Sequence, residues 1–431
     1  MYKDDSLSSV TDFPQFHFDY HYERLIDSTA FLWLQRQRAI QRLDYFLDDI
    51  TSLNARINAG LFALQSQATQ VWPMIVRQLD QADAGELFVA LWLSIKSRQL
   101  PWLQTVSEHC RRLFDTEPQI LKGAVSALGW LQAEAQPWLL TLLRSQHLSD
   151  KWLGVAGISV QRAMMKPPID SLQALLQRPD CQGGLLQARI LRLIGECKLH
   201  ALTSWLTTPI DNVDVTFWAA WSQALLGRPA ALQDSILQPG PYQKQAVELG
   251  IRAIAQTQTG TARQLINQLI RQQSLDMAMQ ACVALGDPAS VDWLLEIMTT
   301  PALAANAGEA IAAITGLPLD QYQWSLTLND RLSILNTAAD AHDTADKTHA
   351  FQQALDAQQV IPDVIAIKRW WQQQHPRFSA QRYLGGQVTG ELTPAVLPTL
   401  NCRLQRLASM ELALKQADQP LRNTATVEYQ R

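Results

Sequence analysis

One pattern occurs twice in the middle of the chain, and this repeat constrains the fold more than any other feature of the sequence. The segments LIGECKLHALTSWLTTP and ALGDPASVDWLLEIMTTP each contain an apolar stretch that reaches a glycine, a short polar break, an amphipathic stretch with a tryptophan and a final Thr-Thr-Pro. The two glycines, Gly195 and Gly286, are 91 residues apart, which suits three units of about 30 residues. This period is typical of stacked helix pairs, so we predict an α-solenoid of HEAT-like repeats over residues 80–317.

Residues that end and start helices fall at the boundaries of these units. A glycine accepts the left-handed conformation that closes many helices, and Asp287 followed by Pro288 suits the start of the next one. A single helix pair cannot bury its apolar face alone, so neighbouring units must stack. Apolar residues of the helix after Pro288 recur at the spacing of one helical face: Val291, Leu294, Leu295 and Met298.

The segments on either side of the repeats have patterns of their own. Residues 24–79 keep a helical spacing of apolar residues, which predicts a helical N-terminal cap. Residues 318–359 carry six Asp against one Arg and one Lys, and we interpret them as an acidic insert or linker. Residues 360–431 carry nine Lys or Arg against five Asp or Glu, and we expect a C-terminal helical module there. The predicted fold class is therefore all-α.

The stretch FHFDYHY, residues 16–22, alternates aromatic with polar residues, as an extended chain with one aromatic face would. We expect residues 1–23 to form an extended aromatic arm that packs on the helical cap. Pairing with the alternating segment QYQWSLTL in a small sheet is the other arrangement that this pattern allows.

Charge and cysteine content bound the function class. The net charge is −4 and the pI about 6.1, whereas binding along a phosphate backbone needs a clustered basic surface, and this balance argues against a nucleic-acid partner. The five cysteines are scattered and form no CxxC pair, which favours reduced thiols in a reducing compartment. The sequence contains no basic-then-apolar leader and no apolar run of membrane-spanning length. We therefore expect a cytoplasmic protein with no membrane contact.

Four stretches of the sequence, in this order along the chain, carry a family resemblance: FLWLQRQRAI…LDYFLDDITSLNARINAGLFAL, ALGDPASVDWLLEIMTTPALAANAGEAIAAITGLPL, IPDVIAIKRWWQQQHPRFSAQRYLGGQ and QRLASMELALKQADQPLRNT. They resemble the opening block, the last repeat and the C-terminal block of an uncharacterised proteobacterial family with HEAT-like repeats. The resemblance carries no assigned activity. Members of that family are often encoded among type VI secretion and spike-tip genes, which implies a role in loading or delivering a secreted protein.

Nine residues are candidates for contacting a partner. They come from positions shared with that family and from the Trp370–Trp371 pair, since neighbours on a helix point in different directions and one of them can face a partner. Arg382 and the residues after it have two interpretations: a left-handed turn whose arginine bonds helix carbonyls, or an anchor surface for a partner. The full set is Trp33, Arg36, Arg38, Trp370, Trp371, Arg382, Tyr383, Leu384 and Arg406.

Two clusters have ligand-like spacing, but we interpret neither as a metal site. The clusters are His17, Asp19 and His21, and His342, Asp346 and His349. The first has no fourth ligand nearby in the sequence, and the second lies in a polar segment rich in Ala and Asp. The sequence contains no motif for zinc hydrolysis, for nucleotide phosphates or for a nucleophilic serine. We therefore predict no catalytic residue, no metal and no cofactor.

These features favour a protein-binding scaffold over an enzyme. We expect an adaptor or chaperone that engages a protein along the concave face of the solenoid. The resemblance implies the particular partner, a secreted effector or a spike-tip component of a type VI secretion system. A HEAT-like enzyme or nucleic-acid-binding protein, such as a glycosylase, is the alternative; a basic concave face with a lone acidic residue in a polar pocket would favour it. A third interpretation makes the chain itself a secreted piece of the tip.

Overall fold

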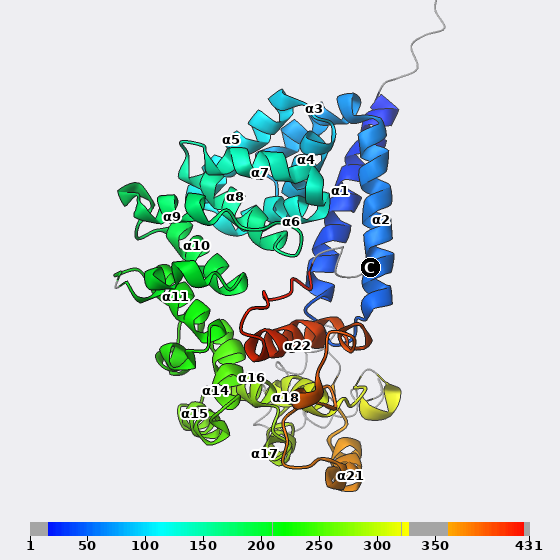
Figure 1. The fold of residues 1–431 in the computed structure, drawn as a ribbon. Helices are drawn as coiled ribbons and strands as arrows, with labels where there is room; N and C mark the ends of the chain where they lie inside the picture. The colour runs from blue at the N-terminus through cyan, green and yellow to red at the C-terminus, as the bar shows by residue number, and fades with distance from the viewer. Residues whose placement is uncertain (1–15, 209, 320, 327–360, 426–431) are drawn as a thin grey trace, which may run out of the picture. The chain divides into compact units, whose positions relative to one another are not determined.

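The computed structural model describes residues 16–208, 210–319, 321–326 and 361–425, without the side chains of residues 16–18 and 322. Helices dominate these residues, and the strands among them form one two-stranded hairpin (Figure 1). The fold is all-α and solenoid-like, as the repeats predict. The chain divides into two compact units: a first unit of Met1–Ile40, Asp48–Lys166 and Ala425–Arg431, and a second unit of Gln41–Leu47 and Pro167–Thr424.

In the first unit, α1, α4, α6 and α8 pack successively on one another, and α3, α5 and α7 form a second layer (Figure 1). Helix α4 is the centre of this unit, because nearly all of its residues are buried. Asp83 and Glu86 form a capping box that fixes where α4 begins. The helices are α1 (Phe16–Ala39), α2 (Leu47–Ser66), α3 (Ala68–Leu79), α4 (Ala84–Lys96), α5 (Leu100–Thr116), α6 (Lys122–Leu131), α7 (Gln136–Leu143) and α8 (Leu148–Val160).

In the second unit, five helical segments pack side by side, and we call them the repeat row: α10, α11, the continuous stretch of α13, η6 and α14, then α16 and α18. They start at residues 185, 213, 243, 275 and 301, so the successive intervals are 28, 30, 32 and 26 residues. The predicted period of about 30 residues is therefore confirmed. The bounds are α9 (Ile169–Gln177), α10 (Leu185–Glu196), η4 (His200–Thr207), α11 (Val213–Leu225), α12 (Gln233–Leu237), α13 (Gln243–Ala246), η6 (Val247–Ile251), α14 (Arg252–Ala255), α15 (Thr259–Arg271), α16 (Leu275–Leu285), α17 (Ser290–Ile297) and α18 (Pro301–Thr315).

The C-terminal part of the second unit closes the ends of two row helices. Its elements are α21 (Val364–Gln374), β1 (Tyr383–Leu384), β2 (Gln387–Val388) and α22 (Cys402–Lys415). Gly286, with φ +70°, ends α16, and its carbonyl accepts a 2.6 Å hydrogen bond from the backbone N–H of Tyr383. A Cβ at Gly286 would lie 2.2 Å from the carbonyl oxygen of Tyr383. This glycine therefore serves both the left-handed helix end and the close approach of the hairpin.

The apolar stripe that the sequence predicts on α17 is buried, with Val291 and Leu294 both 0% exposed. Gly195 has a different role from the one its sequence pattern predicts. It lies inside α10, where a Cβ would meet the Ser222 hydroxyl at 2.5 Å, so it permits close packing on α11 instead of ending the helix. The left-handed residue that follows α10 is Lys198, with φ +53°.

The extended arm is wrong for residues 16–22, because α1 begins at Phe16 and continues to Ala39. On a helix, positions 17 and 21 are one turn apart and position 19 lies on another side, so the alternation no longer places the three on one face. The expected pairing with QYQWSLTL is therefore also wrong. Within that segment, the N–H of Leu326 instead donates to the carbonyl of Ile361 at 2.9 Å. Residues 327–360, including the second cluster of possible ligands, lie outside the described residues.

The apolar periodicity of the N-terminal cap continues through residues 40–46, but the helix does not. Helix α1 ends at Ala39 and α2 begins at Leu47, and Arg42 forms a bidentate ion pair with Asp44 in the connection, at 2.7 and 2.8 Å. The sequence predicts a boundary between the N-terminal cap and the solenoid at residues 79 and 80. The compact units do not divide there, since α1 packs directly on α4.

Within the described part of the chain, no helix combines the length and apolar character that crossing a bilayer requires.

Candidate functional site

The start of α22 is held by the segment Gln41–Leu47, which belongs to the same compact unit. The side chain of Asn401 caps the helix by accepting a hydrogen bond from the backbone N–H of Leu404 at 3.0 Å. The N–H groups of the first two helical residues donate to the carbonyls of Tyr45 and Arg42, at 2.9 and 3.3 Å. These contacts satisfy the amides that a helix start leaves unpaired, and they bring two distant parts of the sequence together.

Helix α22 then lies across the repeat row. Its charged residues reach α18 first and then the continuous segment of η6 and α14, two members of the row (Figure 1). The three ion pairs are Arg403–Glu309 at 2.7 Å, Arg406–Glu248 at 2.7 Å and Glu411–Arg252 at 3.2 Å.

Glu411 is the centre of the buried part of this network. It is 1% exposed, and its carboxylate lies 2.6 Å from the guanidinium of Arg382 and 3.2 Å from that of Arg252. The side-chain amide of Gln256 also donates a hydrogen bond to this carboxylate, at 2.7 Å. Hydrogen bonds from charged donors to a buried carboxylate are strong and directional, so they fix the position of the groups around it.

The same two arginines bond the C-terminal end of α16. The Arg382 guanidinium donates to the carbonyls of Leu285 and Ala284, at 2.7 and 3.2 Å, and that of Arg252 to the carbonyl of Val283 at 3.4 Å. Cations at a helix C-terminus complement the helix dipole and its unpaired carbonyls. Burial lowers the pKa of Arg252 to about 10, and the carboxylates of Glu411 and Glu248 oppose that shift.

The outer pair is bidentate. Arg406 donates to both carboxylate oxygens of Glu248, at 2.7 and 2.8 Å. Burial alone would raise the pKa of Glu248, but the hydrogen bonds and charge of Arg406, with the charge of Arg252, lower it below its usual value. This pair therefore remains charged near neutral pH.

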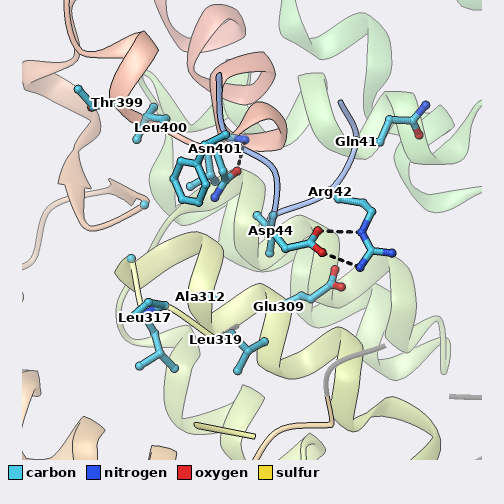
Figure 2. Close-up of a pocket in the computed structure, with 16 residues that line it drawn as sticks. Gln41, Arg42, Asp44, Glu309, Ala312, Leu317, Leu319, Thr399, Leu400 and Asn401 are labelled. Carbon is cyan, nitrogen blue, oxygen red and sulfur yellow. Dashed lines mark hydrogen bonds and ion pairs between the residues drawn. The ribbon is translucent and has the colours of Figure 1, made fainter. Parts of the chain in front are cut away.

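A cavity of about 390 Å³ opens beside the start of α22, and we call it the Phe46 cavity (Figure 2). The turn after α18 supplies apolar lining, as do the segment before α22 and the residues around Phe46, which is 45% exposed. The apolar members of the lining are Leu43, Phe46, Ala312, Leu317, Pro318, Leu319, Leu400 and Leu404. Two ion pairs border the cavity. Arg42 and Asp44 both line it, whereas in the second pair Glu309 lines it and its partner Arg403 does not.

A second cavity, of about 380 Å³, adjoins the first, and we call it the Arg406 cavity. Gln41 and Glu309 line both cavities, so the two share a wall. The lining of the Arg406 cavity is mostly polar and includes the Arg406–Glu248 and Arg403–Glu309 pairs. Met277 and Met279 are its flexible apolar members. An apolar hollow next to a polar one suits a ligand with both kinds of group.

The acidic side chains that border these cavities are largely paired with cations. Asp44 pairs with Arg42, Glu248 with Arg406 and Glu309 with Arg403. All five cysteines are buried, and burial raises the pKa of Cys110 and Cys282 to about 12, so these thiols are not nucleophiles near neutral pH. Among the residues that the structure describes, no group of three or more His, Cys, Asp and Glu side chains is placed to hold a metal ion.

The N-terminal candidates lie in the first unit and are mostly interior. Trp33 is 0% exposed and stacks on Phe88, with ring centroids 5.4 Å apart. Arg36 is also 0% exposed; its guanidinium donates to Asn54 at 2.6 Å and to the carbonyl of Ala425 at 2.8 Å. Of the three, Arg38 alone is exposed, in the last turn of α1. Trp33 and Arg36 therefore stabilise the unit and do not present a surface to a partner.

The C-terminal candidates divide between the core and the network around α22. Trp371 is 3% exposed, and its indole N–H donates to Asp292 of α17 at 2.9 Å, so it faces the repeats. Trp370 is half-buried and packs edge-on against Trp324. Tyr383, at 6% exposure, belongs to the hairpin core.

The structure distinguishes the two interpretations of the RYLGG stretch, a left-handed turn and an anchor surface for a partner. Leu384 is 1% exposed, and Arg382 bonds helix carbonyls before a turn in which Gly385 and Gly386 have φ of +58° and +77°. The left-handed turn is confirmed, and the anchor surface is wrong for this stretch, because its side chains are directed into the chain itself. Arg406 is in the network and lines a cavity.

Sequence reasoning missed the residues that make this site. Glu411 and Arg252 are 159 residues apart, and nothing in the pattern of either helix indicates that they pair. Phe46 reads as part of a continuous apolar stripe, whereas it lies in the connection between α1 and α2. One signal in the sequence could have indicated the buried network. Glu248 and Arg252 lie within an otherwise apolar helical segment, and charged residues seldom lie on a buried face without a partner.

Comparison of the chain with protein-family models, with the curated proteins and with the solved structures gave no match.

Proposed function

We propose that this chain is a protein-binding scaffold, an adaptor or chaperone, whose partner inserts an apolar side chain into the Phe46 cavity. The observation that carries the proposal is the combination of a half-exposed Phe46 and an apolar lining with charged groups that are already paired. A cavity of about 390 Å³ is large enough for one or two side chains of a polypeptide. Aromatic anchors beside paired charges are typical of protein-binding surfaces.

The partner that we propose is a secreted effector or a spike-tip component of a type VI secretion system, engaged in the cytoplasm. This part rests on the resemblance of the chain's end blocks to the family described above. Helical repeats offer a rigid row on which a partner segment can lie, and α22 illustrates how a helix is held there through charged pairs.

The test is affinity purification of the tagged full chain from its native cells at low salt, with mass spectrometry of the bound proteins. Wild type should retain one partner in a fixed ratio, and Phe46→Ala should lose most of it, because removing an aromatic anchor commonly costs tenfold or more, ~1.4 kcal/mol, in affinity. The matched control is Phe31→Ala, since Phe31 is 62% exposed and lies on α1 of the other unit.

Retention of the partner by the Phe31 variant but not by the Phe46 variant would support the cavity. Equal retention by both variants would refute the cavity as the binding site. Recovery of nucleic acid in place of a protein would refute the adaptor proposal and favour the nucleic-acid-binding alternative.

A further inference from the structure

The Arg406 cavity is enclosed by five segments of the second unit. Its walls come from the connection before α2, from the continuous stretch of α13 and η6, from α16, from α18 and from α22. Its volume of about 380 Å³ is within the ~300–1,000 Å³ of small-molecule sites. The charged members of its lining are three cations and three carboxylates: Lys244, Arg403, Arg406, Glu248, Asp276 and Glu309. Because these charges balance, the lining favours neither a lone anion nor a lone cation.

The charged groups that remain open to a ligand come from different ends of this cavity. Lys244 lies on α13 and forms no ion pair or side-chain hydrogen bond with the described residues. At the other end, Asp276 of α16 accepts a hydrogen bond from Asn306 at 3.1 Å, through one carboxylate oxygen. Glu309 of α18 accepts one from Arg403 at 2.7 Å, again through a single oxygen. The second oxygen of each carboxylate is therefore available to a ligand.

Two buried polar atoms in the lining residues lack a hydrogen-bond partner among the residues that the structure describes. They are Nε of Arg406 and Oε1 of Gln280. Arg406 gives its two terminal nitrogens to Glu248, so its Nε–H is the donor that remains. A buried polar atom without a partner costs free energy, which a ligand group of the right kind recovers. One atom requires an acceptor and the other a donor, as a carboxylate and an amide N–H supply.

We propose that the Arg406 cavity binds a short peptide with free termini. The carboxylate of the peptide lies at Lys244 and at the Nε–H of Arg406, and its ammonium group lies at Asp276 and Glu309. Helix α16 packs between α13 and α18, so the two ends of the cavity are one row helix apart. A peptide spans this separation, whereas the charged groups of a single α-amino acid are attached to neighbouring atoms. The peptide N–H groups supply the donor for Oε1 of Gln280.

The test is isothermal titration calorimetry of the purified full chain with trialanine and with two capped forms of this peptide. N-acetyl-trialanine lacks the ammonium group, and trialanine amide lacks the carboxylate. Wild type should bind trialanine at least about tenfold more tightly than either capped form, because each cap removes a charge that meets a charged residue of the lining.

Two variants assign each terminus to its end of the cavity. Lys244→Met should weaken the binding of trialanine at least about tenfold and remove the preference for trialanine over its amide. Asp276→Asn should leave that preference in place and reduce the preference for trialanine over the acetylated form. Both side chains are exposed, so neither substitution disturbs the core. The matched control is Lys368→Met, an exposed lysine of α21 that lines neither cavity, and it should bind all three peptides as wild type does.

Three results would overturn the proposal: no binding of trialanine to wild type, equal binding of the three peptides, or a preference for the free carboxylate that persists in Lys244→Met. The titrations need no cellular partner, and the substituted residues lie outside the lining of the Phe46 cavity. Failure of this proposal is therefore distinguishable from failure of the proposed function.

Discussion

Removing the charge of Glu411 should destabilise the second unit strongly, because it would leave buried cations without their counter-ion. Glu411 and Arg252 are both 1% exposed, and the Arg382 side chain is only 13% exposed. Glu411→Gln keeps the size of the side chain and one acceptor oxygen but removes the negative charge. Breaking a buried pair in this way typically costs about 3–5 kcal/mol. In a domain of this size each kcal/mol lowers Tm by about 2–4 °C, so we expect a decrease of about 6–20 °C.

The assay is thermal and urea unfolding of the full chain followed by circular dichroism. The matched control is Glu309→Gln, which breaks a pair of the same helix α22 at the surface. Glu309 is 40% exposed and Arg403 21%, so this loss should be about 0–1 kcal/mol.

A double variant separates the buried charge from the lost hydrogen bonds. Arg252→Met together with Glu411→Gln removes the fully buried cation as well, so its loss should be smaller than that of Glu411→Gln alone. If Glu411→Gln costs less than about 1 kcal/mol, or if the double variant loses as much as the sum of the two single variants, the buried charge is not the cause.

Three further predictions follow from the second unit. In urea unfolding, Gly286→Ala should destabilise the chain more than Gly227→Ala does. Both glycines have positive φ, but a Cβ at Gly286 meets the hairpin backbone, whereas one at Gly227 meets nothing within 4 Å. Equal losses of stability in the two variants would contradict this. The pKa of Glu248 is lower in the folded state than its unfolded value near 4.5. Its contribution to stability is therefore complete above pH 4.5 and is lost as the pH falls through the folded pKa. Glu248→Gln should consequently lose less stability than wild type on acidification. Because burial lowers the folded pKa of Lys198 to about 8, the free energy of unfolding should rise between about pH 8 and 10. If the same rise with pH persists in Lys198→Met, Lys198 is not its cause.

The repeat architecture was accessible from the sequence because its signals are local. The 91-residue spacing of Gly195 and Gly286 predicts three repeats, and the row segments α10 and α16 do start 90 residues apart, at residues 185 and 275. The stripe that begins at Val291 is buried, as its helical spacing predicts. Periodicity reports which face of a helix is apolar, and stacked repeats bury that face on their sequence neighbours.

The site was not accessible in the same way, because long-range pairing makes it. Bonding to helix carbonyls is one of two interpretations that the sequence allows for Arg382, but the sequence does not indicate which helix, or that Glu411 lies beside it. The aromatic alternation of residues 16–22 fits a strand and a helix equally on composition, and the helix is what the structure shows. The break at Phe46 depends on hydrogen bonds to the start of α22, more than 350 residues later in the chain.

The most direct measurement of the central claim is site-specific photocrosslinking at position 46 in living cells, with benzoylphenylalanine in place of Phe46. A probe at position 31 on α1, in place of the similarly exposed Phe31, is the control. We expect position 46 to give one discrete crosslinked protein and position 31 to give much less of it, because the partner's side chain should lie within the Phe46 cavity. The absence of a crosslinked protein at position 46, or the same product at both positions, would contradict the claim that this cavity binds a protein partner.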